Sequence, residues 1–179
     1  VLSFSGKTSR LRPFTFSLIK HGPPYNSYGF VSATIQPWYF YPVWQWSPSY
    51  SFEFRTSGFS GTVNDARLMI WFADDDASGD QYFFDDIVIE KYSGSNLVTN
   101  GEFFPIGDPW VFYTNGAGSF VCTDYVSYSS MARIRISAPG TNVQLYQSGI
   151  YLEPNTKYRL SFGAEGSRPL SVFVHRHDA

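Results

Sequence analysis

One stretch of this 179-residue chain occurs twice, near the start and near the end. Residues 2–4 and residues 160–162 both read Leu-Ser-Phe, at an offset of 160 − 2 = 158. After a polar loop, residues 12–21 (RPFTFSLIKH) and residues 168–177 (RPLSVFVHRH) match at an offset of 168 − 12 = 156. The two-residue difference falls in the loop, where length changes are tolerated. A chance match is the alternative. Against it, both copies have the same order of segments, the same Arg-Pro pair and a basic end that contains His. The repeat therefore predicts two copies of one strand pair.

The composition favours β-structure. Aromatic residues make up 20% of the chain and charged residues only 16%. No segment has a convincing amphipathic helical pattern, and Gly and Pro turns separate many short β-type runs. The runs with a strand-like pattern are residues 1–4, 14–20, 30–46, 50–54, 67–72, 81–90, 111–113, 118–123, 132–137, 142–147 and 149–152. We therefore expect an all-β fold, an antiparallel β-sandwich of the jelly-roll type.

Charge and hydropathy exclude several classes of partner. The net charge is −2 and no basic stripe is present, so we expect no nucleic-acid partner. No apolar run has the length of a membrane span.

Cys122 is the single cysteine, so no disulfide can form within the chain. The chain begins inside an apparent strand without a signal peptide, and we expect it to be a fragment of a longer protein.

Residues 96–103 (NLVTNGEF) resemble the opening of a β-sandwich carbohydrate-binding module of the family four/nine/twenty-two type. The likeness continues through Trp110 and residues 132–134, 141–150, 152–158 and 160–162, which form the first half of the module in that family. The middle and closing strands of the pattern are found upstream, at residues 2–4, 44–45, 50–54 and 81–88. The resemblance therefore covers nearly the whole chain, in rotated order.

The rotated order implies a domain organisation. Residues 1–92 would be the back half of a module, 93–96 a joint, and 97–179 the front half, with 158–179 repeating 1–23. Two arrangements stay open, a segment cut from a tandem array and a circular permutant. Neither half can cover its own apolar faces, so the halves must pair within one chain or between chains. The surplus strand pair predicts strand addition from a neighbouring copy.

The strand at 142–146 carries the best candidates for sugar binding. Sugar rings stack on aromatic planes, and their hydroxyl groups need amide, acid or imidazole partners. Alternation places Asn142, Gln144 and Tyr146 on one face of this strand. The resemblance implies that this is the concave face of the module. An ordinary solvated sheet face is the alternative.

Two further aromatic groups are candidates for the same role. They are His21, Tyr25 and Tyr28 in a loop at a strand end, and Trp38, Trp44 and Trp46 in a segment broken by prolines. A packed loop is the alternative for the first group, and a place in the core is the alternative for the second. We favour Trp38 as the exposed ring because it follows a proline.

The resemblance also implies a structural calcium ion. Asp85 and Glu102 match acidic positions of the family's first and last strands. Phe104 stands where the family usually has a further acidic ligand, although calcium needs several oxygen ligands. The acidic run at residues 74–80 is a second source of oxygens, with a merely solvated turn as its alternative.

No catalytic motif is present, and we expect no enzyme. Asp85 and Asp86 are neighbours on a strand, so alternation points them to opposite faces and makes no acid/base pair. The predicted function is a non-catalytic, extracellular or cell-surface carbohydrate-binding module of a tandem-repeat protein, with a polysaccharide as partner. The alternative is a structural subunit of an extracellular filament, adhesin or envelope layer, in which copies of the chain assemble by strand exchange.

Overall fold

A computed structural model describes residues 2–5, 12–18, 28–35, 49–73, 76–92, 94–125, 129–166 and 171–176. These residues form strands and turns and contain no helix, so none of them forms a helix that could cross a membrane. The strands are β1 (Leu2–Ser5), β2 (Arg12–Leu18), β3 (Gly29–Ile35), β4 (Ser49–Arg55), β5 (Val63–Trp71), β6 (Gln81–Lys91), β7 (Val111–Thr114), β8 (Ala117–Tyr125), β9 (Ser129–Ala138), β10 (Val143–Leu152), β11 (Lys157–Gly166) and β12 (Ser171–Arg176).

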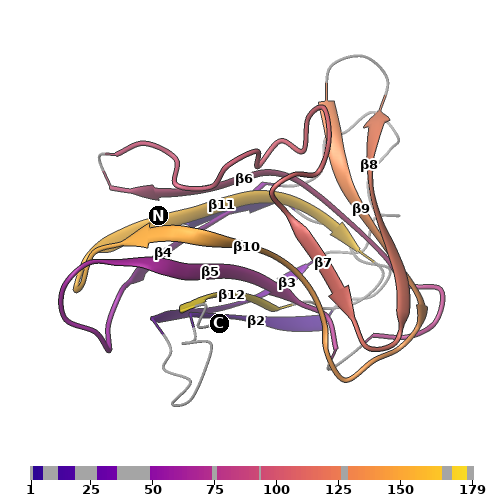
Figure 1. The fold of residues 1–179 in the computed structure, drawn as a ribbon, viewed down its shortest axis with the longest axis horizontal. Helices are drawn as coiled ribbons and strands as arrows, with labels where there is room; N and C mark the ends of the chain where they lie inside the picture. Colours follow the sequence, from indigo (N-terminus) through magenta and orange to yellow (C-terminus); the bar gives the residue numbers. More distant parts are fainter. Residues whose placement is uncertain are drawn as a thin grey trace.

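The strands form two six-stranded sheets that pack face to face (Figure 1). The first sheet has the order β1-β4-β11-β6-β9-β8, and the second has the order β3-β2-β12-β5-β10-β7. Neighbouring strands run antiparallel, except for two parallel pairs, β1 with β11 and β2 with β12. The predicted all-β sandwich is thereby confirmed. Strands from both sides of the joint interleave, because β11 pairs with β4 and β6 and β12 pairs with β2 and β5.

The core lies between the sheets and follows the alternation of the strands. On β5, Leu68 and Ile70 are 0% and 1% exposed and face the first sheet. On β6, Tyr82 and Phe84 are buried in the same layer, and both rings contact Phe72. Full burial of side chains of this size stabilises a fold by about 1.5–3 kcal/mol each. The opposite face of β5 points away from this core.

Asn100 organises the loop that opens the family-like segment. Its side-chain Nδ2 donates to the carbonyl oxygens of Ile106 and Asp108 at 2.6 and 2.7 Å, and its Oδ1 accepts from the Phe104 N–H at 2.9 Å. The indole Nε1 of Trp110 donates to the Asn100 carbonyl at 3.0 Å. Asn100 has a φ of +50°, which asparagine tolerates better than most residues.

Gly101 lets this loop lie directly against β6. A Cβ at this position would overlap the backbone carbonyl of Ile87, while the Ile87 N–H donates to the Gly101 carbonyl at 3.1 Å. Phe103 is fully buried and packs on Trp110 at 5.3 Å between ring centroids. The Asn-Gly pair and the tryptophan that carry the family resemblance are therefore packing residues.

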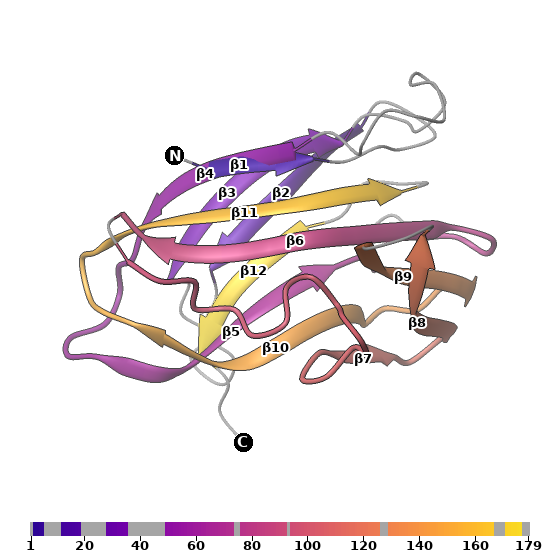
Figure 2. The ribbon, with the colours of Figure 1, turned by 90° about the horizontal axis from the view of Figure 1, so that it is seen from above.

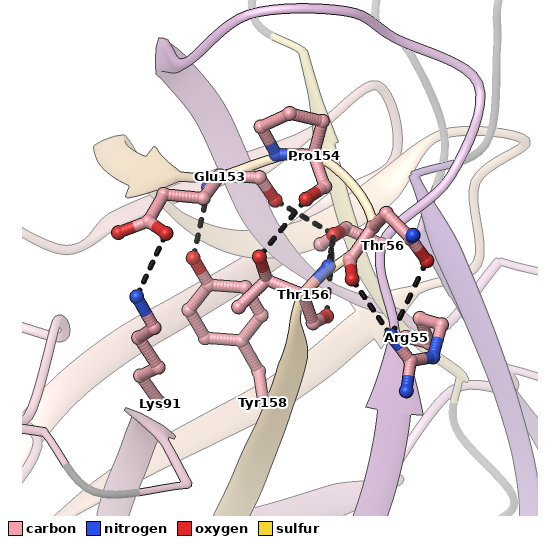
Figure 3. Close-up of polar contacts among 8 residues, drawn as sticks. Arg55, Thr56, Lys91, Glu153, Pro154, Thr156 and Tyr158 are labelled. Carbon is pink, nitrogen blue, oxygen red and sulfur yellow. Dashed lines mark hydrogen bonds and ion pairs between the residues drawn. The ribbon is translucent and has the colours of Figure 1, made fainter.

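The turn at residues 153–156 attaches the start of β11 to the end of β4 (Figure 3). The Thr56 hydroxyl donates to the Glu153 carbonyl at 2.7 Å and accepts from the Thr156 N–H at 2.9 Å. Arg55 Nη1 donates to the Asn155 carbonyl at 2.7 Å. Thr56 is only 1% exposed, so the hydrogen bonds of its hydroxyl group are shielded from water.

The same turn also contacts the end of β6. The Lys91 ammonium lies 2.7 Å from the Glu153 carboxylate, and the Tyr158 hydroxyl accepts from the Glu153 N–H at 2.8 Å (Figure 3). The ion pair itself is half exposed and adds little. The tyrosine and threonine contacts fix the position at which β11 enters the first sheet.

The two copies of the repeated strand pair lie side by side. β1 runs parallel to β11 with Phe4 opposite Phe162, and β2 runs parallel to β12 with Phe16 opposite Val172. These registers reproduce the sequence offsets of 158 and 156. Figure 2 shows β1 next to β4, with β11 beside them. Equivalent residues of the two copies are therefore direct neighbours in the sheets.

Candidate functional site

The face of the second sheet that points away from the core carries aromatic and polar side chains in rows. The register of β7, β10 and β5 sets these rows, because partners across a strand pair share a face. One row is Tyr113, Gln144 and Trp71, and the next is Val111, Tyr146 and Met69. At the backbone level β12 continues the rows with Ser171 and Phe173. We call this surface the outer face of the second sheet.

Gln144 is the centre of a polar chain on the outer face. Its amide Nε2 donates to the Asn142 side-chain oxygen at 2.7 Å. Arg67 Nη1 donates to the Gln144 amide oxygen at 3.3 Å. Gln144 and Arg67 are only 5% and 4% exposed, so these hydrogen-bonded side chains are held rigidly. Asn142 is half-buried and lies just before β10 begins, rather than within the strand.

Arg67 also lies over an aromatic ring. Its guanidinium carbon is 3.9 Å from the centroid of the half-buried Tyr146 ring, a cation–π geometry. Desolvation by burial lowers the pKa of Arg67, and the charge interaction with Tyr146 acts in the opposite direction. A guanidinium nevertheless stays protonated in proteins. The predicted Gln144 and Tyr146 are thus brought together, and Arg67 joins them.

The edge strand β7 contributes one exposed ring and one exposed aliphatic side chain to the outer face. Tyr113 is 48% exposed and Val111 is 44% exposed, and these two side chains flank Gln144 and Tyr146. Trp71 lies on the other side of Gln144 and is half-buried. Amide and guanidinium donors beside flat rings can bind hydroxyl groups and stack on an apolar ring face.

Among the other aromatic candidates, Tyr28 lies in the described part of the chain and does not join this cluster. Tyr28 is 3% exposed and packs on Phe59 at 4.6 Å between ring centroids, as expected of a packed loop. The remaining predicted residues lie outside the described part of the chain, and they are His21, Tyr25, Trp38, Trp44 and Trp46.

Sequence reasoning missed three residues of the outer face, Arg67, Trp71 and Tyr113. Residues 67–72 were predicted as an apolar strand with no face assigned. The pattern contained the missing signal, because Leu68, Ile70 and Phe72 alternate with Arg67, Met69 and Trp71. The apolar set faces the core, which leaves the other three for the opposite face.

The predicted metal residues lie near a bulge of β6. Opposite β11, β6 has one extra residue between Asp85 and Val88, and Asp86 has a φ of +51°. The bulge breaks the strict alternation that was expected for Asp85 and Asp86. Burial, reinforced by the charges of Asp86 and Glu102, raises the pKa of Asp85 to about 7.

A calcium ion at Asp85 and Glu102 would need further oxygen ligands besides these two carboxylates. Within the described ranges, no group of three or more acidic, His or Cys side chains is placed to hold one metal ion. Calcium takes about six to eight oxygen ligands, more than these two side chains supply. The run at residues 74–80 is only partly described. Calcium stays a prediction.

Comparisons with known proteins find a match for part of the chain. Neither a curated protein nor a solved structure matches it. One family model does match, and it is described as a carbohydrate binding domain. Its match includes the opening motif at Asn100 and Gly101 and the whole of β10, with Gln144 and Tyr146. The predicted resemblance is thereby confirmed for residues 95–179, which match the carbohydrate binding domain family CBM_4_9.

Proposed function

We propose that the chain is a non-catalytic carbohydrate-binding module that acts outside the cell or at its surface, and that the glycan lies on the outer face of the second sheet. The observation that carries this proposal is the chain of hydrogen bonds from Arg67 through Gln144 to Asn142, flanked by Tyr146 and the exposed Tyr113. Gln144 and Tyr146 on β10, Asn142 and Tyr113 lie within the segment that matches the carbohydrate binding domain, and Arg67 on β5 lies outside it.

The chemistry of the outer face suits binding more than catalysis. Amides and a permanently charged guanidinium exchange hydrogen bonds with hydroxyl groups, but they are poor proton-transfer groups near neutral pH. Phenol and indole rings offer flat apolar surface to the C–H face of a sugar. Because Gln144 is held at both ends by Arg67 and Asn142, little side-chain entropy is lost when a ligand docks beside it.

Affinity gel electrophoresis against a panel of soluble polysaccharides tests the proposal. We expect retardation by at least one polysaccharide, and about 5- to 10-fold weaker binding for Gln144→Ala, the loss of roughly one hydrogen bond to a ligand. Ser148→Ala is the matched control, because Ser148 is exposed on the same strand. Circular dichroism must show that Gln144→Ala stays folded. Equal retardation of Gln144→Ala and the wild type would place the glycan elsewhere.

A second candidate function is a structural subunit that assembles through its strands. The observation in its favour is the parallel, in-register pairing of the two copies of the repeat. Negative-stain electron microscopy and the polysaccharide panel separate the two functions. Fibres that bind none of the polysaccharides support the structural subunit, and retardation without fibres supports the carbohydrate-binding module.

A further inference from the structure

The two copies of the repeat have interchangeable places in the sheets. β1 is parallel to β11, and β2 is parallel to β12. Each strand of the first copy therefore has the same direction as the equivalent strand of the second copy. β11 is antiparallel to β4 and β6, and β1 is antiparallel to β4 as well. β12 is antiparallel to β5, a direction that β2 shares. Strand direction therefore allows either copy in either place.

β4 accepts both copies at the same residue. Tyr50 is opposite Phe4 of β1 and also opposite Phe162 of β11, and these two residues are equivalent in the repeat. The pairing of β1 with β4 shifts register at Ser3. Tyr50 of β4 is thus aligned with two strands that contain the same sequence, Leu-Ser-Phe.

The two copies are not equally well attached. β11 aligns with β6 at eight positions, and the buried Thr56 and Tyr158 contacts fix the turn before it. β12 aligns with β5 at six positions. By contrast, among the described residues β2 meets β12 at two positions and aligns with β3 at seven. The strands β1, β2 and β3 are therefore the less firmly attached unit, and β2 and β3 would move together.

We propose that this unit, β1–β3, is exchanged between copies of the chain, so that β1 and β2 of one copy dock beside β11 and β12 of a second copy. The contacts made after exchange are those made within one chain, so exchange costs little and depends on protein concentration. The inference does not rest on glycan binding. It supplies the contact that the structural-subunit candidate requires.

Cysteine cross-linking in a Cys122→Ser background tests the exchange. Ser3 and Ser161 precede the aligned Phe4 and Phe162, and neighbouring strands lie close enough for a disulfide. Two single variants, Ser3→Cys and Ser161→Cys, are incubated together at high concentration and then oxidised. A mixture of Ser3→Cys and Ser119→Cys is the control, since Ser119 is exposed on the edge strand β8.

Exchange predicts a disulfide heterodimer of Ser3→Cys with Ser161→Cys, several-fold above the control mixture. The double variant Ser3→Cys/Ser161→Cys should then give dimers and longer ladders that increase with concentration. A heterodimer no more abundant than in the control, with the double variant cross-linked only within single chains, would overturn the proposal. If the cysteine variants misfold, light scattering of the wild type decides: a mass that rises with concentration supports exchange, and a constant monomer mass contradicts it.

Discussion

At the scale of single residues, the opening motif at Asn100 and Gly101 has a clear structural role. Asn100 satisfies the backbone of its loop through three side-chain hydrogen bonds, and Gly101 allows that loop to touch β6. The sequence identified these residues through a resemblance, and their physical role became visible in the structure. Alternation placed Gln144 and Tyr146 on one face of their strand, and the resemblance made that face a candidate site. Alternation also places Arg67 on the face opposite Leu68, but it indicates neither the burial of Arg67 nor its partners.

The first residue-scale prediction concerns Gly101. We expect Gly101→Ala to destabilise the fold severely, by more than about 3 kcal/mol, because the new Cβ would overlap the Ile87 carbonyl. Gly149→Ala is the control: its φ is +82° but nothing lies within 4 Å of the added Cβ, so strain alone should cost about 1 kcal/mol. Urea unfolding measures both changes in the free energy of unfolding. Similar losses for the two variants would contradict the close approach.

A second residue-scale prediction concerns the pH dependence of stability. The pKa of Asp85 is raised from 3.8 to about 7 in the folded chain, so between these values the folded state holds a proton that the unfolded state releases. Its contribution to stability is therefore lost as the pH rises from about 4 to about 7. We expect Asp85→Asn to unfold at a higher urea concentration than the wild type at pH ~8, and the difference to shrink towards pH ~4.

The same variant tests the calcium prediction. A calcium ion held by Asp85 and Glu102 would raise the melting temperature of the wild type at pH ~8 when calcium chloride is added, and would leave Asp85→Asn unchanged. Equal melting curves of the wild type with and without calcium chloride would contradict a site there.

At the scale of elements, alternation predicted most strands, and bulges account for the main departures. Residues 142–147 and 149–152 were expected as two runs, but β10 continues through Gly149, whose φ of +82° accommodates one extra residue opposite β5. The bulge at Asp86 is a second case. A one-residue bulge shifts the phase of the alternation, as between the buried Phe84 and Ile87 on β6, but the sequence does not show which residue is the extra one.

The turn between β10 and β11 gives an element-scale prediction. Thr56→Val keeps the shape of the side chain but removes the hydroxyl that bonds to Glu153 and Thr156. We expect a loss of about 1–3 kcal/mol, because a buried carbonyl and N–H lose their partner. Ser57→Ala, at the exposed neighbouring position, should change stability by less than about 0.5 kcal/mol. Chemical denaturation followed by circular dichroism would refute the role of the turn if the two variants were equally stable.

At the scale of the whole molecule, the repeat predicted that two strand pairs are equivalent, and the structure adds that they are neighbours. The sequence could not distinguish pairing within a chain from pairing between chains, because strand patterns carry no information on which molecule supplies the partner. In the structure, strands from before and after the joint interleave in the middle of both sheets, in the orders β4-β11-β6-β9 and β2-β12-β5-β10. Among the described residues, buried hydrophobic side chains from both segments form one cluster.

This interleaving predicts a single unfolding transition. Heating followed by far-ultraviolet circular dichroism, tyrosine and tryptophan fluorescence and calorimetry should give one coincident midpoint. If β11 left, the backbone edges of β4 and β6 would lose their partners and the core would lose Leu160 and Phe162. Two separate transitions would show that residues 1–92 and 97–179 fold independently.

The most direct measurement of the proposed function is a calorimetric titration with a polysaccharide that retards the protein in gels. Tyr113→Ala removes an exposed ring from the outer face, and Tyr92→Ala removes a ring of similar exposure, 63% against 48%, at the joint. We expect Tyr113→Ala to weaken binding about 5- to 30-fold, the loss of roughly 1–2 kcal/mol of stacking, with the affinity of Tyr92→Ala unchanged. Wild-type affinity in Tyr113→Ala, or an equal loss in both variants, would contradict a glycan site on the outer face.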